Sequence, residues 1–85
     1  MRDYLPIIIK KSSISQQALE VLGPVTEVRE GWRLEYNASV RYAGDDETAI
    51  FDFMHVIAAY DLPIELDDVV KFCWDEVKTL ALPLP

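Results

Sequence analysis

An alternation of apolar and polar side chains over residues 32–42 constrains the fold of this chain more than any other feature. A period of two residues is typical of a β-strand that buries one face and leaves the other in water. The pattern therefore predicts a long strand with one apolar face. That face carries Trp32, Leu34, Tyr36, Ala38, Val40 and Tyr42, and the polar face carries Arg33, Glu35, Asn37, Ser39 and Arg41.

A second strand and a hairpin turn precede this one. Residues 25–28 (VTEV) suit a strand, and Arg29-Glu30-Gly31 follows them. A three-residue hairpin loop usually has Gly in its last, left-handed position, so we expect these three residues to form the loop. This register would place Val28 opposite Trp32 on the inner face of the hairpin, with Glu27 on the outer face.

The N-terminal residues predict a further strand and a short helix. Tyr4–Lys10 (YLPIIIK) is rich in β-branched residues, and Pro6 places the start of this strand at a sheet edge. Ser13 and Gln16 fit a capping box, in which each side chain bonds a backbone N–H at the start of a helix. Gly23-Pro24 is expected to end that helix.

A longer and very apolar helix is expected after Gly44. Asp45 suits its N-cap, because a carboxylate there meets the free N–H groups and the positive end of the helix dipole. The apolar side chains cover well over half of its circumference, and Phe51 and Ala58 lie beyond any single-sided core. Asp61-Leu62-Pro63 is expected to end the helix.

The last pattern predicts a third helix from about Leu66 to Ala81. Acidic and lysine side chains alternate with apolar ones at intervals that place the two kinds on opposite faces of a helix. Phe72 would lie on the polar side of it, beside Glu76. The apolar stripe comprises Leu66, Val69, Val70, Cys73, Trp74, Val77, Leu80 and Ala81.

These elements together predict the fold class. The order β-α-β-β-α-α makes residues 1–85 a single domain of the α+β class. A three-stranded sheet with the helices packed on one face would bury each apolar surface. The patterns leave the strand order open.

The chain offers little for catalysis, metal binding or cofactor binding. His55 is the only histidine and Cys73 the only cysteine, so neither a zinc site nor an internal disulfide is expected. The acidic residues at 45–47 lack the alternation of a calcium loop. Neither a nucleophile motif nor a Gly-rich phosphate loop is present in the sequence. We therefore expect no enzymatic activity, no metal and no cofactor.

Direct nucleic-acid binding and membrane insertion are also disfavoured. The chain has 15 acidic and 8 basic residues, and the resulting net charge of −7 repels phosphates. Its longest apolar runs fall well short of the ~20 residues that span a membrane. No secretory leader is recognisable at the N-terminus, and the single cysteine suits a reducing compartment, so a cytoplasmic location is expected.

Charge is divided unevenly along the chain. Residues 1–43 carry six basic and five acidic side chains, a net charge of +1, and residues 44–85 carry two and ten, a net charge of −8. Such asymmetry favours a protein partner with a basic surface. An alternative is that the acids only keep a half-apolar domain in solution.

The leading hypothesis is an inhibitor that occupies a basic, nucleic-acid-binding surface of another protein. Immunity proteins against nuclease toxins, antitoxins and small phage-encoded inhibitors of host defence share this size and charge. Phe72 would be the aromatic anchor of the interface, unless it packs against the preceding helix or the C-terminal tail. The candidate partner-binding residues are Asp45, Asp46, Glu47, Asp52, Asp67, Asp68, Phe72, Asp75 and Glu76.

A second hypothesis is a self-associating structural subunit, such as a homodimer. The apolar content of the helix after Gly44, which exceeds what one core can cover, favours it.

Overall fold

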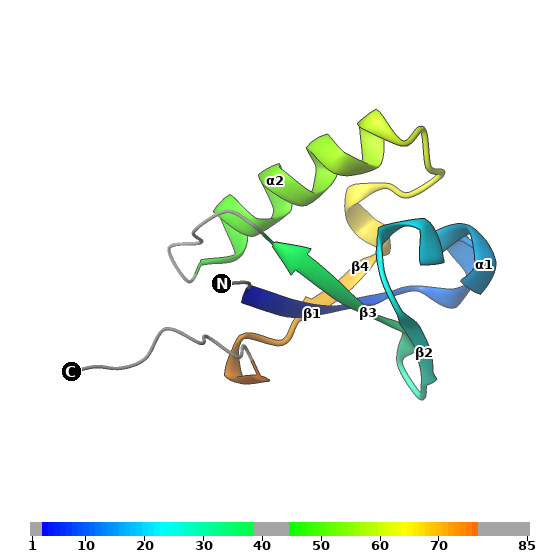
Figure 1. The fold of residues 1–85 in the computed structure, drawn as a ribbon, viewed down its shortest axis with the longest axis horizontal. Coiled ribbons are helices and arrows are strands. Elements are labelled where there is room, and N and C mark those ends of the chain that lie inside the picture. Colours follow the sequence, from blue (N-terminus) through cyan, green and yellow to red (C-terminus); the bar gives the residue numbers. More distant parts are fainter. Residues whose placement is uncertain (1–2, 39–44, 77–85) are drawn as a thin grey trace.

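A four-stranded antiparallel sheet, in the order β2-β3-β1-β4, is the framework of the protein (Figure 1). The computed structural model describes residues 3–38 and 45–76. The predicted strand residues 39–42 and the predicted helical residues 77–81 lie outside this part of the chain. The strands are β1 (Asp3–Ile9), β2 (Val25–Val28), β3 (Gly31–Ala38) and β4 (Val69–Phe72).

Two helices pack on the same face of the sheet. The short helix α1 (Gln16–Leu19) continues into a 3-10 turn (Glu20–Leu22), and α2 (Asp46–Ala59) crosses the sheet diagonally (Figure 1). This arrangement confirms the predicted α+β class, with a four-stranded sheet in place of the predicted three strands and a strand in place of the third helix. One cluster of buried side chains joins helices and sheet: Leu5, Ile7, Ile9, Ile14, Leu19, Val25, Leu34, Tyr36, Ala49, Phe53, Ile57 and Ile64.

Strand β1 lies in the middle of the sheet, so the expected edge position of Pro6 is wrong. Residues 5–9 are all buried, because β3 and β4 flank the strand and side chains cover both faces. The carbonyl oxygen of Pro6 accepts the N–H of Cys73, but Pro6 has no N–H to return the bond. The Cys73 carbonyl instead accepts the N–H of Glu76, and β4 ends at this point.

The hairpin of β2 and β3 has a register one residue away from the prediction. Val28 pairs with Gly31 and Glu27 with Trp32, so only two residues form the loop. The shift moves Glu27 from the expected outer face to the helix-covered face. Val25 becomes the buried member of β2, opposite Leu34.

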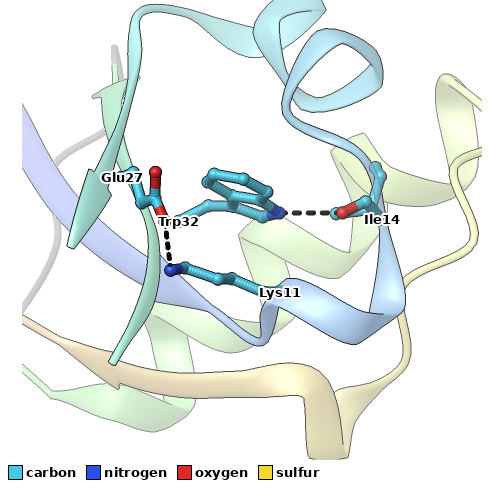
Figure 2. Close-up of polar contacts among 4 residues, drawn as sticks. All are labelled: Lys11, Ile14, Glu27 and Trp32. Carbon is cyan, nitrogen blue, oxygen red and sulfur yellow. Dashed lines mark hydrogen bonds and ion pairs between the residues drawn. The ribbon is translucent and has the colours of Figure 1, made fainter. Parts of the chain in front are cut away.

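Polar contacts around Trp32 accommodate Glu27 on this face (Figure 2). The carboxylate pairs with Lys11 at 2.6 Å, and the Lys11 ammonium lies 5.5 Å from the centroid of the Trp32 ring. The indole N–H of Trp32 donates to the carbonyl oxygen of Ile14 at 2.8 Å. These contacts fasten the segment between β1 and α1 to the hairpin.

The cap of α1 differs from the expected Ser13 and Gln16 capping box. Ser15 is the N-cap, and its side chain accepts the N–H of Ala18 at 3.2 Å. The Ser13 hydroxyl donates instead to the carbonyl oxygen of Lys10, within the turn that follows β1. The helical segment ends at Gly23, as predicted.

The predicted third helix from Leu66 is wrong over the described residues. A 3-10 turn (Leu66–Asp68) leads into β4, and a second 3-10 turn (Trp74–Glu76) follows. The pairing of β4 with β1 shifts register at Val70, because Ile9 pairs with Val69 and Ile8 with Lys71. The strand therefore contains a β-bulge.

Candidate functional site

An apolar groove lies between α2 and β4. It consists of two adjoining hollows of about 770 and 250 Å³, and both are lined by Glu47, Ile50 and Leu66. We call it the α2–β4 groove. Its other lining residues are Asp46, Thr48, Phe51, Met54, His55, Ala58, Val69, Val70, Lys71 and Phe72.

The groove follows from the excess apolar surface of α2. Ala49, Phe53 and Ile57 form the face that is buried in the core. Positions 50 and 54 lie next to that face around the helix, and positions 58 and 51 follow further round, on the side of Leu66. A sheet with four strands covers the first face only, so the second face remains open to solvent.

Three large apolar side chains of the groove are exposed to an extent that is unusual for their type. Phe51 is 67% exposed, Leu66 59% and Val70 44%. Only two other large apolar side chains in the described part of the chain, Val21 and Tyr60, are classed as exposed. A concentration of this kind marks an interaction surface.

The charges around the groove are mostly negative. Asp46 and Glu47 line it at the start of α2, and the exposed Glu65 and Asp67 flank Leu66 in the chain. Lys71 is the only lysine or arginine among the residues that line it. The apolar floor thus has an acidic rim.

Two acids at the start of α2 have structural partners. Asp45 is the predicted N-cap, and its carboxylate accepts the N–H of Thr48 at 2.7 Å and also contacts the Thr48 hydroxyl. These bonds, led by the one from the backbone, lower the pKa of Asp45. Asp46 accepts the indole N–H of Trp74, which ties the segment after β4 to the helix.

The cap makes a testable contribution to stability. The pKa of Asp45 is lower in the native protein than in the unfolded chain, where it is about 4. The stabilisation by the charged cap is therefore complete above the unfolded pKa and is lost as the pH falls through the native pKa. Asn caps a helix without titrating. We expect the melting temperature of the wild type minus that of Asp45→Asn, both measured by circular dichroism, to decrease as the pH is lowered from 6 to 2. A difference that stays constant over this range would contradict the role of the charged cap.

The structure brings together only some of the predicted partner-binding residues. Asp46, Glu47 and Phe72 line the groove, and Asp67 lies beside Leu66 at its rim. Phe72 is half-buried against the core and pairs with Ile7, so its packing is closer to the alternative interpretation than to a free anchor.

The other candidates lie elsewhere or have local roles. The side chain of Asp68 accepts the N–H of Glu65 and closes the turn before β4. Asp52 is half-buried on the flank of α2 opposite the groove. Glu76 reaches the other face of the sheet, and Asp75 precedes it in the same exposed turn.

On that other face, Arg33 is held between two carboxylates. It pairs with Glu76 at 2.7 Å and with Glu35 at 2.6 Å, and these hydrogen bonds raise its pKa. Its cross-strand neighbour on β1 is Ile8. The charge of Arg33 is therefore balanced by these two carboxylates.

Sequence reasoning missed the apolar half of the groove. The sequence pattern predicts Leu66 and Val70 on the apolar stripe of a third helix, whereas both side chains are exposed. The available signal was the surplus apolar surface of the second helix, including Phe51 and Ala58. From the sequence alone, that surplus favours self-association.

Two groups with potential chemistry, His55 and Cys73, lie in the described part of the chain. His55 contacts the carbonyl oxygen of Phe51 through Nδ1, and their rings pack edge to face. Cys73 is buried, and burial raises the pKa of its thiol. Within residues 3–38 and 45–76, no three side chains of the metal-binding types come together.

Comparison with known proteins finds no family model, curated protein or solved structure that matches this chain. None of the helices in the described part is long and apolar enough to cross a membrane.

Proposed function

We propose that the protein is a small binding module that attaches to a basic surface of another protein through the α2–β4 groove. The supporting observation is the combination of exposed Phe51, Leu66 and Val70 with an acidic rim. Protein interfaces commonly have an apolar, aromatic-containing centre and a polar margin. Acids at the margin would select basic partners and speed their association.

The same surface chemistry suggests inhibition as the outcome of binding. Basic surfaces that bind nucleic acids attract phosphates through Lys and Arg, and carboxylates can occupy the same positions. A module of this kind would compete with the nucleic acid. The proposed class is that of immunity proteins, antitoxins and phage inhibitors of host defence, by analogy of size and charge.

The first test is capture of partners from the native host at about 20 and about 200 mM salt, followed by identification of the retained proteins. We expect a basic protein that is retained at low salt and released at high salt. The double variant Glu47→Lys with Asp67→Lys should weaken its binding by about ten-fold or more, because it reverses two charges at the rim.

A matched control is available at the other end of the sheet. Glu20→Lys with Glu30→Lys changes the net charge by the same amount, and both side chains are exposed in the part of the chain before β3. This control should bind almost as the wild type does. Equal losses in the two double variants, or a binding affinity that is insensitive to salt, would reject the proposed function.

Self-association is the second candidate function. The exposed apolar groove favours it, since a second copy could cover Phe51 and Leu66. A monomer in sedimentation equilibrium at concentrations of tens of micromolar would exclude it.

A further inference from the structure

We propose that the occupant of the α2–β4 groove is a basic amphipathic helix of the partner protein. This inference depends on the proposed function and gives the partner a structural class. Phe51, Met54 and Ala58 are spaced three and four residues apart, so they form one row along α2. From position 47 to position 58 this wall is about 16 Å long, which equals about three turns of a second helix.

The groove suits a helix because its apolar contacts run along a helical wall. In helix-in-groove recognition, apolar side chains at positions i, i+3 or i+4, and i+7 insert between the walls. Phe51 and Met54 provide one wall here, and Leu66 and Val70 provide the other. A row of leucine-sized side chains would cover the exposed parts of these four residues.

Addition of a strand to β4 is the less favourable arrangement. β4 is the edge of the sheet next to the groove, but it has only four residues. It also contains the bulge at Val70 and an exposed lysine, Lys71. Short length, bulges and lysines are the features that hinder pairing at sheet edges.

The charge of the rim determines the charge of the occupant. Asp46 and Glu47 lie at the start of α2, while Glu65 and Asp67 flank Leu66, and Lys71 is the only lysine or arginine that lines the groove. Lys and Arg on both sides of an apolar stripe would therefore meet acids at the start of α2 and beside Leu66. A second copy of this chain would bring the same acids to the interface and a further net charge of −7.

The test uses three peptides of about 18 residues, a length that covers the groove with a turn at each end. The first peptide has Leu on one helical face and Lys on the others. The second has the same composition with the leucines spread around the helix, and the third has Glu in place of Lys. In fluorescence anisotropy at about 150 mM salt, the first should bind at least ten-fold more tightly than either of the others.

Variants then locate the binding surface. Phe51→Ser and Leu66→Ser should each weaken binding of the first peptide by about ten-fold, because both remove an exposed apolar contact. Val21→Ser is the matched control, since Val21 is 55% exposed but lies in the turn after α1, outside the groove. It should change the affinity less than two-fold, roughly the limit of such measurements.

Three results would overturn the helix proposal. The first is an affinity for the scrambled peptide equal to that for the amphipathic one. The second is peptide binding that survives Phe51→Ser and Leu66→Ser but is lost in the double variant Glu47→Lys with Asp67→Lys. The protein would then bind basic partners through its acidic residues alone, and the proposed function would stand without the helix. The third is a dimer of the protein that Phe51→Ser dissociates, which would assign the groove to a second copy.

Discussion

Gly31→Ala is expected to destabilise the protein by about 3 kcal/mol or more, the upper end of the cost of overpacking. A Cβ atom at this position would lie 2.1 Å from the carbonyl oxygen of Ile9 and 3.0 Å from its carbonyl carbon. Both neighbours are backbone atoms of the central strand, so neither can move as a side chain does. The start of β3 would have to separate from the end of β1.

Denaturant unfolding followed by circular dichroism would measure this loss. Glu30→Ala, one residue earlier in the same turn, is the control, because Glu30 is exposed and its removal should cost no more than about 0.5 kcal/mol. A Gly31→Ala protein as stable as this control would show that β1 and β3 do not approach as described. A domain of this size has a total stability of roughly 4–13 kcal/mol, so the expected loss is a large part of it.

The same glycine explains why the hairpin register could not be predicted. The sequence shows Gly31 after two polar residues, and a left-handed loop position is the usual local reason for such a glycine. Its φ of 159° is far from the left-handed value of about 57°. The requirement for glycine comes from this positive φ and from the close approach of Ile9 in another strand, and the hairpin sequence contains no information about that contact.

The missing strand has a comparable cause. Val69 and Phe72 both pack against the core, because the bulge at Val70 adds one residue between them. Two side chains three residues apart on one face are the pattern of a helix. The period alone therefore cannot distinguish a bulged strand from a helical turn, and the β-branched pair at 69–70 was the only local indication of a strand.

Prediction succeeded where local chemistry decides the structure. Asp45 caps α2 because its carboxylate needs only the N–H of Thr48, three residues further along the chain. The groove, in contrast, requires Phe51 and Leu66 to face one space across a chain reversal. Its acidic rim could be predicted from composition, but its apolar walls required knowledge of which surfaces the sheet covers.

Phe53→Ala should be the most damaging side-chain truncation in the described part of the chain, with a loss of about 3–5 kcal/mol. Phe53 is fully buried beneath α2 and is the largest of the fully buried side chains. Its ring meets that of Tyr36 edge to face, with centroids 5.3 Å apart. The truncation would leave a cavity between α2 and β3 and would remove this contact, which chemical denaturation can measure.

Phe51→Ala is the matched control for this truncation and connects stability with function. Phe51 is on the same helix, two residues before Phe53, but it is 67% exposed, so its loss should change stability by no more than about 0.5 kcal/mol. The same variant should impair binding of the basic helical peptide. If Phe51→Ala destabilised the protein as much as Phe53→Ala, Phe51 would be part of the core, and the α2–β4 groove would lose its principal anchor. If instead only binding changed, one face of α2 would pack in the core and another face of the same helix would bind the partner.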